Sequence, residues 1–222
     1  PSAHPHCTMA QEGTVVIYGM GISGNVIPPV LLCLDRKCGG MEMMNILEGE
    51  HKTPEKLALN PFGQMPIMVD GDFCLAESNT ILRYLAKAYA PETYGADLKT
   101  QATIDWAMDW ASTNFLNNYK DIWYVVAGFG AAPEDQAAAN QKAVANLQAF
   151  EKKFLPEGKK FIGGDSLSIA DYKIASWIWY IDHSAIEKKV GYKNPARFTQ
   201  YANDFYAALS PESQKFLEAA KG

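Results

Sequence analysis

The sequence predicts two parts of different fold class: an α+β domain with a mixed β-sheet, followed by an all-α helical domain. Up to Tyr89, segments with strand character are interleaved with segments of helical period in the order βαβαββα. After a short break with proline and glycine at Pro91–Gly95, only helical periods occur. We therefore expect residues 9–90 to form the α+β domain, 91–96 a linker and 97–222 the helical domain.

The first half of the α+β domain holds two strands and two helices. Thr14–Tyr18 is a β-branched strand, and a glycine-rich turn leads from it into a helix. Pro28 and Pro29 are tolerated only in the first turn of that helix, and Gly39-Gly40 is expected to end it at about Cys38. The expected elements are strands at 14–18 and 41–46 and helices beginning near 25–28 and at 54.

A β-hairpin and a helix complete this domain. Ile67–Val69 is a short strand, Asp70-Gly71-Asp72 a hairpin turn, and Phe73–Ala76 the returning strand. Ser78 is a good N-cap, and the apolar residues behind it fall at helical spacing as far as Tyr89. A mixed sheet with helices on its faces in this order is a thioredoxin-like arrangement.

The helical domain carries two patterns that bear on folding and binding. Ser168 and Asp171 have the spacing of a capping box, with Asp in the usual place of Glu, and we assign them to folding. Phe115, Tyr119 and Trp123 are spaced four apart and make one aromatic stripe, which belongs either to the core or to the wall of a ligand pocket. The expected helices are 97–127, 133–155, 168–184, 195–208 and 211–220.

Composition excludes several classes of protein. The formal net charge of −5, without clustered Lys and Arg, argues against a nucleic-acid partner. The four cysteines form no CxxC and no spaced set with histidines, so we expect free thiols in a reducing compartment and no metal. No apolar run suits a membrane span or a signal peptide, which predicts a soluble, cytoplasmic protein. Pro1–Thr8 matches no element, and we interpret it as a cloning remnant.

Two features near the hairpin could bind a small peptide. A residue before proline is driven toward extended geometry, so the N–H and C=O of Met65, before Pro66, can pair with an extended peptide as a sheet edge does. The start of the Ser78 helix favours a carboxylate, and Glu77 could hold an ammonium group. Together they suit a peptide with both charges at one end; a plain hairpin and a plain helix cap are the alternatives.

The turn after the first strand offers Ser23 where a redox thioredoxin fold has a cysteine, which disfavours disulfide exchange. A serine hydroxyl can instead donate a hydrogen bond to the thiolate of a bound ligand. That bond lowers the pKa of the thiol, and a helix N-terminus adds to the effect. Ser23 could also be a mere turn residue, and Tyr18 is a rival activating group, although it lies within an apolar strand.

The residues just described resemble a known family. The run NPFGQMPIMVDGDFCLAESNTILRYLAKAY, Asn60–Tyr89, closely resembles the glutathione-binding half of the glutathione transferases. The spelling Tyr18-Gly-x-x-x-Ser23-x-Asn25 is similar to the serine-type phi and theta classes, but the chain has Pro28 where the phi pattern usually has an arginine. The resemblance covers the chain from Thr14 onward, more loosely after Tyr89.

The resemblance implies a glutathione site with Ser23 as the activating residue and Asn25 setting its loop. It implies that the glycine carboxylate meets His51 and Lys52, assisted by Gln64. The cysteinyl unit pairs with the backbone of Met65, held by a cis Pro66, and the γ-glutamyl end lies at Glu77 and Ser78. The pocket for the second substrate is expected to contain Met20, Ile22, Phe115, Tyr119 and Trp123.

The resemblance also implies the activity: conjugation of glutathione, as co-substrate, to hydrophobic electrophiles in detoxification, by a homodimer. Reduction of peroxides by the same thiolate is an expected side activity. Two alternatives stay open. One is another glutathione-dependent enzyme on this fold, such as a dehalogenase, an isomerase or an ether-cleaving enzyme. The other is a noncatalytic transferase-like module for dimerisation or binding, against which the intact set of glutathione-binding residues argues.

Overall fold

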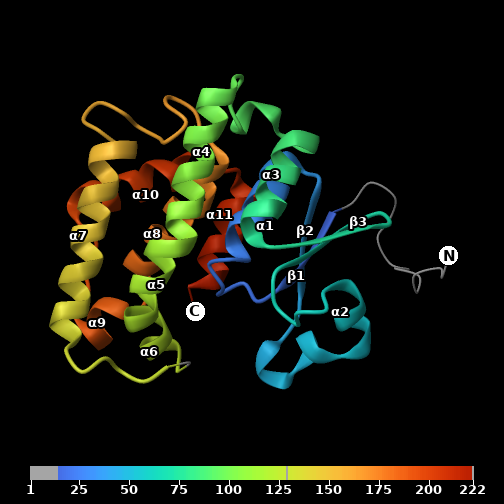
Figure 1. Cartoon of the computed structure of the whole chain (residues 1–222), viewed down its shortest axis with the longest axis horizontal. Coiled ribbons are helices and arrows are strands. Elements are labelled where there is room, and N and C mark those ends of the chain that lie inside the picture. The colour runs from blue at the N-terminus through green and yellow to red at the C-terminus, as the bar shows by residue number, and fades with distance from the viewer. Residues whose placement is uncertain (1–14, 129, 222) are drawn as a thin grey trace. The chain divides into compact units, whose positions relative to one another are not determined.

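The computed structural model describes residues 15–128 and 130–221, so the expected remnant Pro1–Thr8 lies outside the described residues. Contacts between residues divide the chain into two compact units (Figure 1). The N-terminal unit comprises Pro1–Pro91 and Leu209–Ala220, and the helical unit comprises Glu92–Ala208 and Lys221–Gly222.

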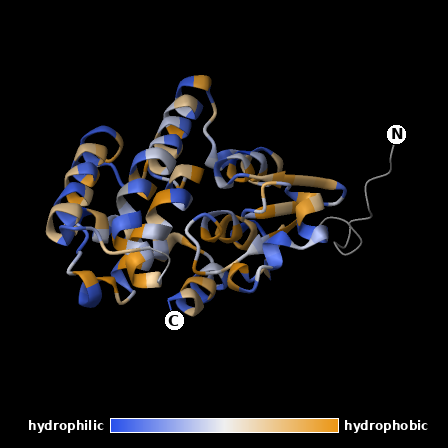
Figure 2. Ribbon diagram, turned by 60° about the horizontal axis from the view of Figure 1, so that its bottom comes forward, coloured by the Kyte–Doolittle hydropathy of each residue, from blue (hydrophilic) through white to orange (hydrophobic). Residues whose placement is uncertain are grey.

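The N-terminal unit is built on a four-stranded sheet with the strand order β2-β1-β3-β4. The central strand β1 (Val15–Gly19) pairs in parallel with β2 (Gly39–Met43) and antiparallel with β3 (Ile67–Asp70). β3 in turn pairs antiparallel with β4 (Phe73–Ala76). The sheet is therefore mixed, as the sequence predicts, and its strands are coloured largely as hydrophobic in Figure 2.

Helices complete this unit in the predicted order βαβαββα. Of its helices, α1 packs against α3, and the C-terminal α11 packs against α1. The α-helices are α1 (Ile27–Arg36), α2 (Pro54–Leu59), α3 (Ser78–Tyr89) and α11 (Pro211–Ala220), and the 3-10 turns are η1 (Ile46–Glu48) and η2 (Glu50–Lys52).

Three predicted boundaries in the N-terminal unit are wrong. The second strand begins at Gly39 rather than Met41, and the helix before it already ends at Arg36. Gly39 pairs with Val15, and a Cβ at Gly39 would lie 1.9 Å from the Val15 carbonyl oxygen, so this position needs glycine for close strand approach. Helix α3 is likewise preceded by Glu77 in the N-cap position, which makes Ser78 its first helical residue.

The C-terminal helix joins the N-terminal unit, which differs from the predicted helical domain 97–222. Asp35 of α1 is the link: its Oδ1 accepts hydrogen bonds from the Ser210 backbone N–H at 2.9 Å and from the Ser213 hydroxyl at 2.5 Å. Ser213 is completely buried. These contacts join residues far apart in the sequence, which the local patterns used for the prediction do not reveal.

The helical unit contains the predicted helices other than 211–220, and one short helix, α9, that the sequence did not indicate. The first predicted helix, 97–127, is one helical path interrupted by two π-helical stretches, η4 and η5. The 3-10 turn η3 (Pro91–Thr93) precedes the helices of this unit. The elements of the helical unit are α4 (Leu98–Trp110), η4 (Ala111–Phe115), α5 (Leu116–Tyr119), η5 (Lys120–Tyr124), α6 (Val125–Ala127), α7 (Gln136–Phe154), α8 (Ile169–Asp182), α9 (Ile186–Val190) and α10 (Ala196–Ala208).

The capping box at the start of α8 is confirmed, and Asp171 is its centre. This carboxylate is fully buried and accepts hydrogen bonds from the Ser168 backbone N–H at 2.8 Å and the Ser168 hydroxyl at 2.7 Å. It also accepts from the Ile162 N–H and the Tyr201 hydroxyl, both at 2.7 Å. Asp171 therefore joins the loop before α8 to α10, which supports the assignment of this motif to folding.

Candidate active site

Four chain segments leave the sheet of the N-terminal unit at the same end. Tyr18 pairs with Ile67, and Ile67 with Ala76, so the end of β1, the start of β3 and the end of β4 are adjacent. Gly19 pairs with Met43, which brings the end of the parallel strand β2 to the same edge. The segments that meet there are the turn with Ser23, the loop leading to His51 and Lys52, the Met65-Pro66 pair and the Glu77-Ser78 pair.

Ser23 lies in the turn between β1 and α1 and is half-buried. Its backbone closes the turn: its N–H donates to the Met20 carbonyl at 3.0 Å, and its carbonyl accepts from the N–H groups of Val26 and Ile27, both at 2.8 Å. Its Oγ accepts a hydrogen bond from the Asn25 N–H at 3.4 Å. In the part of the chain that the structure describes, no acceptor takes the hydroxyl proton of Ser23, so this proton can be donated to a ligand.

The N-terminus of α1 contributes less to anion binding than the sequence led us to expect. The N–H groups of Val26 and Ile27 are already bonded to the Ser23 carbonyl, and Pro28 and Pro29 have no N–H. The partial positive charge at a helix start resides on N–H groups without partners. Because the first turn of α1 offers none, the Ser23 hydroxyl is left as the main donor of this turn.

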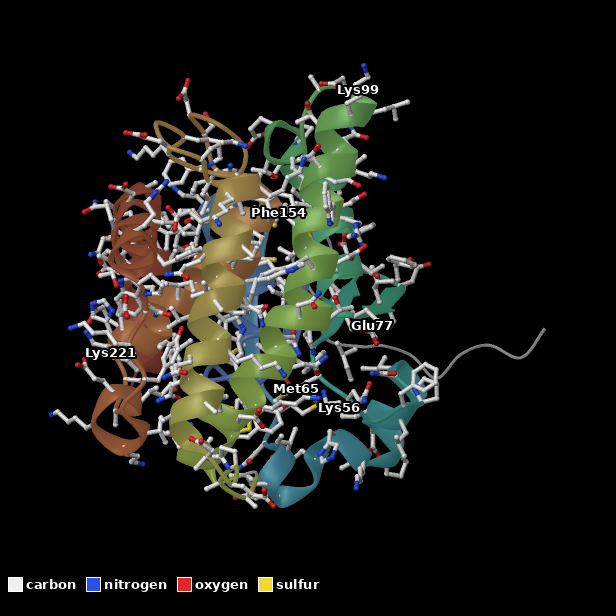
Figure 3. The ribbon with its side chains drawn as sticks, turned by 60° about the vertical axis from the view of Figure 1, so that its left-hand side comes forward. Lys56, Met65, Glu77, Lys99, Phe154 and Lys221 are labelled. Atoms are coloured by element: carbon white, nitrogen blue, oxygen red, sulfur yellow. The ribbon has the colours of Figure 1, made fainter. Side chains whose placement is uncertain are left out.

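Tyr18, the rival activating residue, is part of the core, as its place in an apolar strand predicts. It is 8% exposed, and Met65 packs against the cluster to which it belongs. The sequence did not indicate that Lys56 covers its ring, with the Nζ atom 3.3 Å from the ring centroid. Lys56 and Met65 can be followed in Figure 3. The other buried members of the cluster are Met44, Ile67 and Val69.

The two basic residues predicted to meet a carboxylate lie on η2. Lys52 is exposed, whereas His51 is half-buried, and its Nδ1 atom is buried without a hydrogen-bond partner among the described residues. A Cβ at Gly63 would lie 3.6 Å from the His51 carbonyl and 3.8 Å from Lys52 Cγ, so η2 packs against the loop that leads to Gln64. A buried polar atom without a partner costs roughly 1–3 kcal/mol, which a ligand group bonded to it would offset.

The Met65–Pro66 peptide bond is cis, as the family resemblance implies. Met65 is half-buried and precedes β3, and in the described ranges 15–128 and 130–221 its backbone makes no hydrogen bond. Nearby, the Asn60 side-chain amide donates to the Gln64 carbonyl at 2.9 Å and holds the loop before Met65 in place. An extended peptide could therefore pair with Met65 as the sequence predicts.

The segment between β4 and α3 holds a strained residue. Glu77 has φ 69° and ψ 112°, although it is not glycine, and its carboxylate is exposed and does not cap α3. Strained backbone of this kind costs roughly 1–3 kcal/mol and is concentrated at functional sites. Ser78 is 6% exposed and begins α3, whose first N–H groups lack acceptors within the helix. This segment presents an anionic side chain beside the donors of a helix start.

The aromatic stripe of the helical unit is largely inside its core. Phe115 is 2% exposed and Tyr119 1%, their ring centroids are 4.2 Å apart, and the Tyr119 hydroxyl is bonded to a buried tyrosine and a buried asparagine. Trp123 is 8% exposed. This burial favours the core interpretation that the sequence left open. Met20 and Ile22, in the N-terminal unit, are half-buried in the turn before Ser23, and a substrate pocket lined by these residues stays a prediction.

Among the residues that the structure describes, no group of three or more His, Cys, Asp or Glu side chains is placed to hold a metal ion. None of the described helices is both long and apolar enough to span a membrane.

Comparisons with known proteins agree with the geometry. Residues 42–87 match the family described as "Glutathione S-transferase, N-terminal domain", and residues 104–203 match "Glutathione S-transferase, C-terminal domain". Glutathione S-transferase F9 of Arabidopsis thaliana is 27% identical over 175 residues, covering 75% of this chain and 74% of the relative. Glutathione S-transferase theta-1 of Mus musculus is 34% identical over 139 residues, covering 59% of this chain and 58% of the relative.

A solved structure gives the same fold. The theta class glutathione S-transferase from the citrus canker pathogen Xanthomonas axonopodis pv. citri, with glutathione bound, has a TM-score of 0.77 to this chain at 24% identity. The match covers 92% of this chain and 97% of that one. The chain therefore belongs to the glutathione S-transferase family and is an enzyme of its phi- and theta-like type.

Proposed function

We propose that this enzyme joins the thiolate of glutathione to hydrophobic electrophiles and that Ser23 activates the thiol. The proposal rests on the position and the hydrogen bonding of the Ser23 hydroxyl. It lies at the end of the sheet where four segments converge, it accepts a hydrogen bond from Asn25, and its own proton has no acceptor in the described part of the chain. Asn25 thereby keeps Oγ oriented while the proton remains available to a sulfur atom.

Glutathione is proposed to lie across the segments that meet at this edge. Its free amine and carboxylate, at the γ-glutamyl end, suit the Glu77 carboxylate and the N–H groups at the start of α3. Its extended cysteinyl unit suits the backbone of Met65. Its glycine carboxylate suits the His51 imidazole and the Lys52 ammonium. The proposed binding residues are Asn25, His51, Lys52, Gln64, Met65, Pro66, Glu77 and Ser78.

The reaction begins when the bound thiol gives up its proton to solvent. The Ser23 hydroxyl donates a hydrogen bond to the sulfur, and because this bond favours the charged form, it lowers the pKa of the thiol. The sulfur lone pair then forms a bond to the electrophilic carbon, and the leaving group departs with its electron pair. Ser23 forms no covalent bond, and proximity contributes the remaining rate enhancement. The same thiolate can reduce a peroxide, which we propose as a side activity.

The electrophile is proposed to be apolar because the side chains beside the proposed position of the sulfur are apolar. Met20 and Ile22 are half-buried in the turn that ends at Ser23.

We further propose that the enzyme acts in the cytoplasm as a homodimer, which its family resemblance implies. Phe62 is 79% exposed and Leu47 69%, so both apolar side chains are accessible to a partner subunit. Sedimentation velocity tests the dimer: a species of monomeric mass at all accessible concentrations contradicts it.

The test of the proposed function compares Ser23→Ala with the wild type, using glutathione and an activated aryl chloride. A hydrogen bond to a charged group is worth about 1.5–3 kcal/mol, so kcat/KM should fall about 10- to 150-fold in Ser23→Ala. Ser166→Ala, an exposed serine of the helical unit, is the matched control and should keep wild-type kinetics.

An unchanged kcat/KM in Ser23→Ala contradicts the assignment of Ser23. Product analysis with haloalkanes, activated double bonds and aryl ethers separates conjugation from dehalogenation, isomerisation and ether cleavage.

A further inference from the structure

Two cysteines outside the proposed site meet at the end of α1. The N–H of Cys38 donates to the Cys33 carbonyl at 3.1 Å, and the N–H of Lys37 donates to the Leu34 carbonyl at 3.2 Å. Lys37 has φ 53°, in the left-handed region. This pair of bonds around a left-handed residue is the Schellman motif, in which the side chains two positions past the helix and three positions before its end contact each other. Cys38 and Cys33 occupy those two positions.

The two thiols differ in exposure and in acidity. They are hydrogen-bonded to each other, and this bond lowers the pKa of Cys38, with the nearby Arg36 assisting and burial and Asp70 opposing. The same bond raises the pKa of Cys33, and burial and the charge of Asp70 add to the effect. Cys38 is 9% exposed, whereas Cys33 has no exposed surface. Cys38 is therefore the more accessible and the more acidic of the two buried thiols.

The backbone brings the two cysteines together in one tight turn. A disulfide requires Cα atoms about 4.4–6.8 Å apart, and Cys33 and Cys38 are joined by a direct backbone hydrogen bond in a tight turn. In the described part of the chain, the remaining cysteine, Cys74, lies on β4 and takes no part in this thiol pair. Bond formation would need side-chain rotation at the end of α1 but no new approach of distant segments.

We propose that Cys33 and Cys38 form a reversible dithiol–disulfide pair that is oxidised by a small disulfide such as glutathione disulfide. The Cys38 thiolate attacks one sulfur of the reagent, whose S–S bond breaks, and one glutathione thiolate leaves and is protonated. The Cys33 thiol then loses its proton and attacks Cys38 Sγ, expelling the second glutathione. Two electrons pass from the protein to the reagent, and both thiol protons end on the released glutathione molecules.

The test uses the full chain with Cys7→Ser and Cys74→Ser, which leaves Cys33 and Cys38 as its cysteines. The protein is incubated with glutathione disulfide, quenched in acid, and examined by intact mass and by thiol counting in denaturant. We expect both thiols to disappear, no glutathionyl adduct to remain, and a reducing agent to restore both thiols. Protein that keeps both thiols under excess reagent, or that ends with glutathione on Cys38, overturns the proposal.

Two single variants test the order of attack. Cys33→Ala should stop at a stable adduct of one glutathione on Cys38, because no resolving thiol is left. Cys38→Ala should keep its buried Cys33 reduced; rapid modification of Cys33 in this variant would overturn the proposed order. Circular dichroism confirms that each variant is folded, and the measurement on the intact pair decides the proposal if a variant fails to fold.

The thiol pair does not depend on the proposed function. Ser23→Ala should be oxidised at Cys33 and Cys38 like the wild type even where its conjugation of glutathione is lost. A failure of the thiol pair to close would likewise leave the conjugation assay unchanged.

Discussion

Replacement of His51 should weaken glutathione binding without weakening the fold. The Nδ1 atom of His51 is buried and has no hydrogen-bond partner among the described residues. In the protein without ligand, this atom therefore contributes no hydrogen bond to the stability of the fold. A bound carboxylate that accepts from this ring would form a charge-assisted hydrogen bond worth about 1.5–3 kcal/mol. His51→Ala should therefore raise the Kd for glutathione at least about 10-fold. In the same variant the free energy of unfolding should change by less than about 1 kcal/mol. Removal of the ring takes away both the cost of the unpaired Nδ1 atom and the favourable packing of the ring, and these two contributions offset each other.

Isothermal titration with glutathione and urea denaturation measure the two quantities. His51→Asn is the matched variant, because an asparagine amide can place a donor close to the position of Nδ1 and should recover part of the affinity. If His51→Ala binds glutathione like the wild type, the histidine does not contact the ligand. If His51→Ala instead lowers the free energy of unfolding by several kcal/mol, the histidine supports the fold, which contradicts the role proposed for it.

Three further predictions concern charge, folding and pH. Lys52→Ala should raise the KM for glutathione by only about 2- to 5-fold, because Lys52 is exposed, and this increase in KM should be smaller at high salt. Lys99→Ala, which replaces an exposed lysine of α4, is the control and should leave the KM unchanged. Asp171→Ala should lower the free energy of unfolding in urea by at least about 3 kcal/mol, because it leaves several buried donors unpaired, and an unchanged urea midpoint would contradict this. The hydrogen bond from Tyr84 to Asp70 raises the pKa of Tyr84 to about 12, so the stability it contributes is complete below about pH 10 and is lost as the pH rises toward 12. Urea unfolding between about pH 10 and pH 12 should show a smaller loss of stability in Tyr84→Phe than in the wild type. Equal losses of stability would show that the Tyr84 hydroxyl is not responsible.

Local patterns were sufficient to predict the order of the elements. The β-branched strand before Ser23, the hairpin turn at Asp70-Gly71-Asp72 and the capping box at Ser168 are each specified by a few neighbouring residues, and the structure contains all three. The Met65-Pro66 and Glu77-Ser78 segments could be predicted in the same way, since they lie directly before β3 and directly after β4, whereas His51 and Lys52 lie well beyond the end of β2 and were expected from the family resemblance. Their meeting at one edge follows from the strand order β2-β1-β3-β4, which depends on long-range pairing.

The features that the sequence did not reveal all depend on the three-dimensional arrangement of the folded chain. Gly39 was expected to end a helix but lies in a strand, because its role is contact with the Val15 carbonyl. The left-handed backbone of Glu77 and the unpaired Nδ1 of His51 have no signature in residue order. Cys33 and Cys38 are five residues apart, which puts them on different faces of a regular helix, and only the left-handed turn at Lys37 brings them together.

The proposed role of Ser23 is to lower the pKa of the glutathione thiol with a hydrogen bond. The ultraviolet absorbance of the bound thiolate, followed as a function of pH in the wild type and in Ser23→Ala, measures this effect. Because the first turn of α1 has no N–H to offer, nearly all of the shift should depend on Ser23. In the wild type we expect a bound thiol pKa well below the solution value of about 8.5, and in Ser23→Ala a pKa that is higher by about 1–2 units. Bound glutathione with an unshifted pKa, or a lowered pKa that persists in Ser23→Ala, would contradict this role of Ser23.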